Sequence, residues 1–321
     1  MDINQTEKFK FLSCLAMIAV VVGHSAPATV IGTMIGKMCL FAVPMFFAVS
    51  GFWFIKSLEK YGALLLLQRK VRTLALPYLI WCFVGWLAFR PGLGDTPMLI
   101  LLGKIFGFAK TFPIGNLPLW YVRALISFII IGCALWVGLR PFLAKSGFLF
   151  CCLFMGSVFL IKYCLGYGVA SDSSSSFFCI GCYLSLAQID LNAGKKVIRR
   201  VAGSVLLILY VALVEAVDPT GFIGFGIQCC ALVSLWLLSD DVVLPQFMGV
   251  IAPYSAIIYF MHGIIVFKLD SLILPCFPVA ECHLNCYFII KFLLLISMLG
   301  VIAFGLKKKM PRLYAVLSGY R

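Results

Sequence analysis

The chain has 321 residues, of which 63% are hydrophobic and 12% are charged, and its formal net charge is +14. Soluble domains carry about 25% charged residues, so this composition and a mean hydropathy of +1.08 exclude a soluble globular protein. They predict an all-α, polytopic membrane bundle that forms a single integral-membrane domain over residues 1–321.

Apolar segments long enough to cross a hydrocarbon core of about 30 Å as helices recur along the whole chain. We predict about ten transmembrane helices, in chain order over residues 9–30, 33–55, 72–90, 118–139, 147–164, 175–190, 198–216, 220–239, 250–268 and 286–306.

Three connections between these spans carry signals of their own. Residues 56–71 are basic and predict an amphipathic helix along the inner membrane surface. Residues 91–117 hold an apolar centre, MLILLGKIFGF, that is short for a span, so we expect a re-entrant or interfacial helix on the outer side. The run SDSSSS at residues 171–176 predicts a short polar turn on the outer side.

The basic residues indicate the orientation of the chain, because cytoplasmic connections are enriched in Lys and Arg. With the N-terminus in the cytoplasm, 18 of the 26 basic residues fall in inner segments, five in outer segments and three within spans. We therefore expect both termini in the cytoplasm and a multi-pass protein of the cell (inner or plasma) membrane. The predicted topology explains the positive net charge, so nucleic-acid binding is not needed to account for it.

Two histidines lie inside predicted spans at similar depth. His24 is about 22 Å from the inner end of the first span, and His262 is about 18 Å from the inner end of the ninth. The structural interpretation of each is a hydrogen bond from the imidazole to a backbone carbonyl in the bundle core. Intramembrane ionisable groups are functional candidates by default, and two of them at one depth favour a functional interpretation.

Other basic side chains also lie near the outer ends of spans. Arg123 follows Trp120 and Tyr121, and a cation flanked by aromatic rings suits a sugar or anion site. Lys37 and Lys291 lie at comparable depth in other spans, and we expect their ammonium groups to extend to the membrane interface.

On the inner side, the second span ends close to a basic cluster formed by Arg69, Lys70 and Arg72. Ser50 and Gly51 near that end are small and permit close backbone approach. Arg matches phosphate oxygens in bidentate fashion, so the cluster predicts a site for a phosphorylated ligand that enters from the cytoplasm. The alternative is the ordinary enrichment of basic residues at the inner membrane face.

All twelve carboxylates fall in connections or at the ends of spans. A buried Ser-His-Asp triad and a relay of acidic groups are therefore unsupported. Most of the fourteen cysteines lie within spans, where a free thiol packs as a small hydrophobe. Cys179 and Cys182 form a CxxC pattern in mid-helix, and we expect no metal site.

Five stretches, in this order, resemble the acyltransferase family 3 of integral membrane O-acyltransferases. They are LAMIAVVVGHSA with His24, FAVPMFFAVSGFWF with Ser50, LQRKVRTLALPYLIW with Arg72, LPLWYVRALI with Trp120 and Arg123, and YSAIIYFMHGIIV with Tyr259 and His262. The resemblance covers nearly the whole chain. One position departs from it: the family usually has Arg or Lys eleven residues before the first-span histidine, where this chain has Ser13. Lys10 lies on roughly the same helix face and is the expected replacement.

The resemblance implies transfer of an acyl group, with acetyl expected, from cytoplasmic acyl-CoA to a hydroxyl of a glycan or lipid-linked saccharide. It implies an acyl-CoA site that comprises Lys10, Ser50, Arg69, Lys70 and Arg72. It also implies that the acceptor is oriented, or the carbonyl polarised, by Trp120, Arg123, Tyr259 and His262. The implied partners are acyl-CoA, the saccharide acceptor and membrane lipid, with neither a metal nor a nucleic acid.

His24 is the expected catalytic residue. An imidazole with an unperturbed pKa near 6.5 suits general-base action on the acceptor hydroxyl at neutral pH. The second possibility is a transient acyl-imidazole, in which His24 carries the acyl group.

Two other classes of function are compatible with the composition. A polytopic transporter or flippase for a lipid-linked sugar predicts translocation that acyl donors do not affect. A structural or assembly subunit predicts that His24→Ala leaves the acetylation of surface polysaccharide unchanged.

Overall fold

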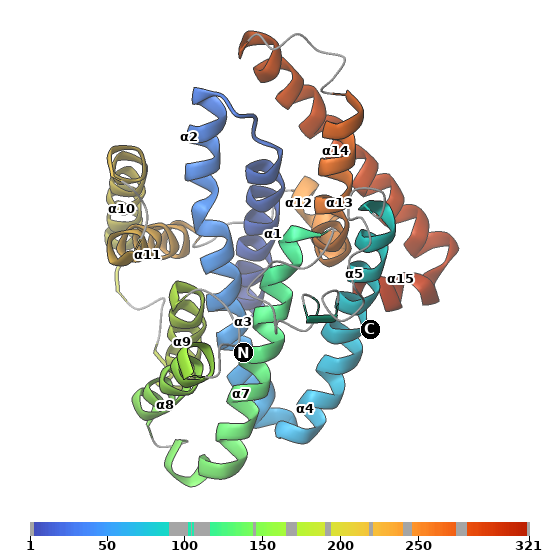
Figure 1. Cartoon of the computed structure of the whole chain (residues 1–321). Coiled ribbons are helices and arrows are strands. Elements are labelled where there is room, and N and C mark those ends of the chain that lie inside the picture. Colours follow the sequence, from blue (N-terminus) through green and yellow to red (C-terminus); the bar gives the residue numbers. More distant parts are fainter. Residues whose placement is uncertain are drawn as a thin grey trace. The chain divides into compact units, whose positions relative to one another are not determined.

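The computed structural model describes residues 3–89, 102–103, 105, 116–143, 146–164, 172–189, 194–217, 221–239, 246–273 and 281–319. These residues are almost entirely helical and contain no strand, which confirms the predicted all-α fold (Figure 1). Because a helix satisfies its own backbone hydrogen bonds, it is the element that an apolar chain of this kind can place in lipid.

Within the described part of the chain, eight helical stretches are long and apolar enough to cross a membrane. They are Thr6–Ser25, Val30–Tyr61, Ala63–Phe89, Trp120–Arg140, Lys196–Ala216, Gly221–Leu238, Met248–Leu272 and Leu284–Lys309. The other two predicted spans correspond to the shorter apolar helices Gly147–Tyr163 and Ser173–Leu186. The cytoplasmic location of the termini stays a prediction.

The chain divides into two compact units, which are described separately. Unit 1 comprises Met1–Phe46, Ile189–Ser255 and Val266–Gly300. Unit 2 comprises Phe47–Gln188, Ala256–Ile265 and Val301–Arg321.

Unit 1 is built from helices near the N-terminus and from the second half of the chain. It contains α1 (Ile3–Ser25), α2 (Val30–Met38), the first residues of α3 (Ala42–Tyr61), α10 (Lys196–Ala216), α11 (Gly221–Leu238), α12 (Gln246–Ile251), the ends of α13 (Ser255–Ile273) and the first part of α14 (Glu281–Lys309). Helices α10 and α11 pack against each other around a buried cluster of Tyr210, Val214, Ile227 and Ala231.

The predicted first span extends past its observed end, because the chain starts a new helix after Ser25. Thr29 is the N-cap of α2, and its hydroxyl accepts a hydrogen bond from the backbone N–H of Gly32 at 3.0 Å. A threonine in this position satisfies one of the free N–H groups at a helix start. The same hydroxyl donates to Asn285 Oδ1 of α14 at 2.8 Å, which joins the starts of two helices of unit 1.

Unit 2 is built mainly from the middle of the chain. It contains α3 from Phe47 onwards, α4 (Ala63–Lys70), a π-helix (Val71–Ala75), α5 (Leu76–Phe89), α7 (Trp120–Leu143), α8 (Gly147–Phe159), α9 (Asp172–Leu186), residues 256–265 of α13, the end of α14 and α15 (Pro311–Ser318). Its core is aromatic: the ring of Phe128 lies 5.5 Å from Phe47, 5.6 Å from Phe154 and 5.4 Å from Phe178 between centroids.

Two glycines allow the backbones of α3 and α9 to touch. A Cβ added to Gly51 would lie 2.1 Å from the carbonyl oxygen of Phe178, and one added to Gly181 would lie 1.9 Å from that of Ala48. The Cys182 thiol also donates to the Gly51 carbonyl oxygen at 3.4 Å. Gly51 therefore permits the close backbone approach that the sequence predicts at this end of the helix.

The connections differ from the sequence-based expectations in two places. The helix predicted over residues 56–71 has narrower bounds: α3 continues to Tyr61, Gly62 interrupts the helix with a φ of 72°, and α4 begins at Ala63 and leads through the π-helix into α5 (Figure 1). Its location along the membrane surface stays a prediction. The turn predicted at residues 171–176 is wrong from Asp172 onwards, because α9 begins there and buries Ser174 and Ser175. Most of the helix predicted within residues 91–117 lies outside the described residues.

Candidate functional site

Three hydroxyl side chains of unit 2 meet where α3, α7 and α13 pack together. Ser50 Oγ of α3 lies 3.0 Å from Tyr121 Oη of α7. The Tyr121 ring contacts the Tyr259 ring of α13 edge to face, with centroids 5.7 Å apart. Both tyrosines are buried, whereas Ser50 is half-buried. We call Ser50, Tyr121 and Tyr259 the hydroxyl cluster.

The hydroxyl cluster brings together residues that are predicted for two different parts of the site, Ser50 for the acyl donor and Tyr259 for the acceptor. Tyr121 contacts both of them. Sequence reasoning missed Tyr121 itself, although it stands between Trp120 and Arg123 in the motif that was singled out. Trp120 and Arg123 are both half-buried in the first turn of α7, and the Trp120 ring lies 6.2 Å from that of Phe47.

His262 lies one turn after Tyr259 on α13 and is fully buried. Its Nδ1 is hydrogen-bonded to the backbone carbonyl oxygen of Tyr259, and because a carbonyl only accepts, Nδ1 carries the proton. A hydrogen bond from the imidazole to a backbone carbonyl is what the purely structural interpretation of His262 predicts. It also fixes the ring orientation, with centroids of His262 and Tyr259 5.4 Å apart.

The segment before α7 is anchored to α13 by two further hydrogen bonds within unit 2. Asn116 donates from Nδ2 to the Phe260 carbonyl oxygen at 3.0 Å, and the Tyr259 hydroxyl donates to the Pro118 carbonyl oxygen. Asn116 is fully buried, and Gly263 leaves the space that its side chain occupies, since a Cβ on Gly263 would lie 2.6 Å from Asn116 Oδ1. No sequence signal singled out Asn116.

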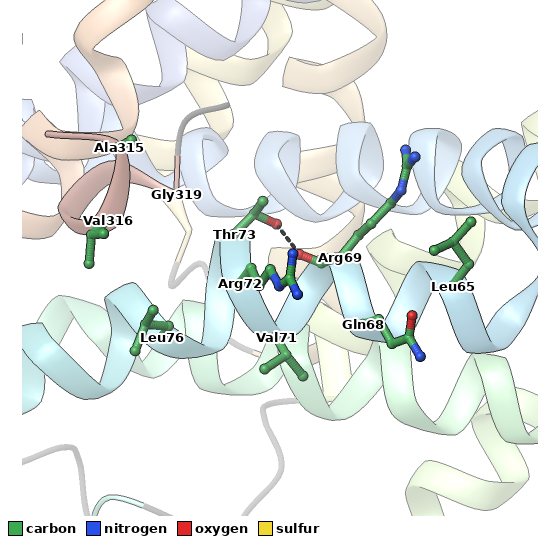
Figure 2. Close-up of a pocket in the computed structure, with 10 residues that line it drawn as sticks. All are labelled: Leu65, Gln68, Arg69, Val71, Arg72, Thr73, Leu76, Ala315, Val316 and Gly319. Atoms are coloured by element: carbon green, nitrogen blue, oxygen red, sulfur yellow. Dashed lines mark hydrogen bonds between the residues drawn. The ribbon is translucent and has the colours of Figure 1, made fainter. Parts of the chain in front are cut away.

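A separate cavity of about 1130 Å³ in unit 2 contains two of the three clustered basic residues. We call it the arginine pocket, and Figure 2 shows its lining, which consists of Leu65, Gln68, Arg69, Val71, Arg72, Thr73, Leu76, Ala315, Val316 and Gly319. Lys70 is half-buried and does not belong to this lining. The pocket is large enough for a small organic ligand, since ligand pockets span roughly 300–1,000 Å³.

The arginine pocket is built on an irregular part of the helix. Arg72 and Thr73 lie in the π-helix Val71–Ala75, and such single π turns occur frequently at functional sites. The Thr73 hydroxyl donates to the Arg69 carbonyl oxygen at 3.0 Å. The Arg69 guanidinium stacks on the Tyr61 ring, 3.7 Å from its centroid, which ties the pocket to the end of α3.

His24 and Lys10 both belong to α1 in unit 1. The His24 side chain is exposed at the last turn of the helix. Lys10 is exposed and forms an ion pair of 2.7 Å with Glu7, one turn away. Lys8, which sequence reasoning had not singled out, is only 5% exposed and lies over the Trp236 ring, 4.2 Å from its centroid. Ser13 is half-buried.

The lysines expected to reach the membrane interface instead pair with acids of unit 1. Lys291 is 4% exposed, and its ammonium donates to Asp270 Oδ1 at 2.9 Å. Tyr287 donates to the same oxygen at 2.9 Å. Lys37 lies 3.8 Å from Glu215, with about a third of each side chain exposed. The expectation is therefore wrong for Lys291, because the partner on α13 was not visible in the sequence of α14.

The CxxC pattern lies in α9 among packed helices. The Cys182 thiol contacts Gly51 as described above. The Cys151 thiol of α8 donates to the Cys179 carbonyl oxygen at 3.4 Å, and the Cys179 thiol donates to the Cys151 carbonyl oxygen at 3.9 Å. Within the described ranges, the cysteines, histidines and acids form no group of three that could hold a metal ion.

Comparison with known proteins identifies the family to which the chain belongs. A family model described as an acyltransferase domain matches residues 9–306. Searches of curated proteins and of solved structures gave no match. The matched range contains His24, the hydroxyl cluster and both arginines of the pocket, and it leaves out only short segments at the two ends. The chain is thus a membrane acyltransferase that belongs to acyltransferase family 3.

Proposed function

We propose that this acyltransferase moves an acyl group, acetyl in the simplest case, from cytoplasmic acyl-CoA to a hydroxyl of a glycan or lipid-linked saccharide. The observation that carries the proposal is the arginine pocket, whose lining combines two arginines with several apolar residues in a chain of this family. Guanidinium groups bind phosphate oxygens in pairs, and acyl-CoA is an acyl donor that carries phosphates.

The donor would extend from the arginine pocket along α3. Its phosphates bind Arg69 and Arg72, with Lys70 adding positive charge nearby. Tyr61, on which Arg69 stacks, is eleven residues from Ser50 on the same helix, which corresponds to about 16 Å along its axis. A flexible arm that follows α3 over this distance brings the thioester to the hydroxyl cluster.

The chemistry is an acyl transfer from sulfur to oxygen. The acceptor oxygen attacks the thioester carbonyl carbon, the C–S bond breaks, and an ester and a free thiol result. His24 takes the proton of the acceptor hydroxyl and returns it to the departing thiolate. In the alternative course, His24 first accepts the acyl group itself and then passes it to the acceptor.

The remaining residues orient the reactants. Trp120 and Arg123 bind the acceptor saccharide at the start of α7, and Tyr259 and His262 hold that part of the site in place through their contacts with Pro118 and with each other. Tyr121 and Ser50 supply hydroxyls where the carbonyl of the donor arrives. Lys10 takes the place of the basic residue that the family usually has at the position of Ser13.

The test uses cells that lack the protein and are complemented with wild type, His24→Ala or His24→Gln. Surface glycans are analysed by mass spectrometry, and membranes are assayed with acetyl-CoA labelled in the acetyl group. Wild type alone should restore the acetyl mass and transfer label to glycan. Glycan that keeps its acetyl groups without the protein, or label transfer by His24→Ala at the wild-type rate, would contradict the proposal. Translocation of a lipid-linked sugar that is independent of acetyl-CoA would favour the transporter.

A further inference from the structure

The C-terminal helix α15 forms one side of the arginine pocket, opposite the helix that carries the arginines (Figure 2). Ala315, Val316 and Gly319 belong to the lining, although they are more than 240 residues away from Arg72 and Thr73 in sequence. The basic cluster therefore accounts for only part of this cavity.

Helix α15 is held against this site by specific contacts. Trp81 of α5 donates from Nε1 to the Leu317 carbonyl oxygen at 2.9 Å. Gly319 caps α15 in the left-handed conformation, with a φ of 66°, and a Cβ there would lie 1.9 Å from the Thr73 carbonyl oxygen. Tyr314 is buried at 2% exposure. Helix α15 therefore forms an ordered side of the pocket that is fixed to α5 and the π-helix.

The lining of the pocket combines two kinds of chemistry. Arg69 and Arg72 contribute positive charge on one side, and Val316 of α15 contributes an apolar side chain that is 40% exposed on the other. Exposed Leu76 and Val71 extend the apolar surface next to the arginines. A free phosphate would use the guanidinium groups alone and leave this apolar surface uncovered. A ligand that carries a flat ring next to its phosphates uses both sides.

We propose that α15 is the specificity wall of the donor site and packs against the adenine ring of the acyl donor while the arginines bind its phosphates. This inference rests on the proposed function and deepens it, because it assigns recognition of the nucleotide part of the donor. An acyl-pantetheine, which has the reacting thioester without the nucleotide, does not contact this wall. A phospholipid headgroup shares the phosphate chemistry but lacks the ring.

The experiment uses the full-length protein in detergent or nanodiscs with two matched variants. Val316→Asn removes apolar surface from the wall, and Leu313→Asn makes the same kind of change at a residue of α15 that is 38% exposed and lies outside the pocket lining. KM and kcat are measured with acetyl-CoA and with acetyl-pantetheine. Binding of radiolabelled adenosine 3′,5′-bisphosphate is measured by equilibrium dialysis.

Val316→Asn should raise KM for acetyl-CoA and weaken binding of the bisphosphate, each by about tenfold, as expected for loss of a valine-sized apolar contact. It should leave KM for acetyl-pantetheine and kcat unchanged, and Leu313→Asn should behave like wild type. Equal effects of the two variants, or bisphosphate binding that phosphatidylglycerol vesicles or inorganic phosphate compete with equally well, would overturn the inference.

Failure of the proposed function gives a different result. If wild type transfers acetyl from acetyl-pantetheine and acetyl-CoA with the same KM, the transfer stands and the specificity wall is refuted. If wild type transfers from neither donor, the proposed function fails. The dialysis experiment then still decides whether α15 recognises an adenine nucleotide.

Discussion

Ser50 Oγ and Tyr121 Oη lie 3.0 Å apart and form a polar link between α3 and α7 in an otherwise aromatic part of unit 2. Both hydroxyls would lie where the donor arm ends if the donor binds as proposed. A neutral hydrogen bond of this kind contributes about 1 kcal/mol. Under the proposed function, the link therefore combines a modest structural role with a position next to the reacting carbonyl.

Tyr121→Phe removes the hydroxyl and keeps the ring contacts with Phe47 and Tyr259. We expect the protein to fold and kcat/KM for acetyl transfer to fall about fivefold to tenfold, as for loss of about 1 kcal/mol of stabilisation. Ser50→Ala should have a similar effect. Because the two hydroxyls bind each other, the double variant should lose little more than either single one. Additive losses in kcat/KM would show that the hydroxyls act independently.

Arg72→Gln tests the phosphate contact of the donor. We expect KM for acetyl-CoA to rise about tenfold, because one charge-assisted contact is lost. Arg72→Lys should recover this loss only in part, since an ammonium cannot bind in bidentate fashion. Lys308→Gln removes the same charge from an exposed residue outside the pocket lining and is the control. If it raises KM as much as Arg72→Gln does, general surface charge rather than the pocket attracts the donor.

Gly51→Ala tests the crossing of α3 and α9. The added methyl group would meet the Phe178 carbonyl oxygen at 2.1 Å, so the helices must move apart. We expect the free energy of unfolding in detergent to fall by about 1–3 kcal/mol, as is typical of overpacking. Gly138→Ala on α7 is the matched control, because nothing lies within 4 Å of the new Cβ. Equal thermal stability of the two variants would mean that the crossing is not tightly packed.

The Lys291–Asp270 pair should stabilise unit 1 through its burial. Asp270→Asn leaves an ammonium that is only 4% exposed without its carboxylate. Loss of one partner of a fully buried ion pair costs about 3–5 kcal/mol. Because the Asp270 side chain is 26% exposed, we expect a smaller loss, which still moves unfolding to a lower denaturant concentration. The double variant Asp270→Asn with Lys291→Met should regain much of this stability.

The half-exposed pair of Lys37 and Glu215 provides the comparison for that experiment. Its atoms are 3.8 Å apart, and about a third of each side chain is exposed. Exposed pairs contribute about 0–1 kcal/mol, so Glu215→Gln should change stability little. A larger loss for Glu215→Gln than for Asp270→Asn would reverse the assignment of the buried pair.

Helix positions were predictable from sequence because they depend on local composition. Eight of the predicted spans correspond to helices of transmembrane length, and their boundaries differ mostly by a few residues. The larger errors arose where polar residues begin a helix, as at Thr29 and Asp172. Serine, threonine and aspartate favour both turns and helix caps, so their presence alone does not distinguish a turn from a helix start.

The candidate site residues were predictable only in part. Arg69 and Arg72 of the predicted basic cluster line one pocket, and Tyr259 and His262 contact each other. Tyr121 and Asn116 were missed because an aromatic or amide residue near a helix start has many ordinary roles. Only their contacts with Ser50 and Phe260 distinguish them.

The sequence by itself determined the helical membrane fold, the family and the chemical types of the candidate site residues, because each depends on composition or on short motifs. Tertiary structure alone decided which distant residues meet. Trp81 binds a carbonyl oxygen 236 positions away, Lys291 finds its acid on another helix, and α15 completes the arginine pocket. Such contacts depend on how helices pack, and packing is set by side-chain shape and buried polar partners that no single segment of the chain contains.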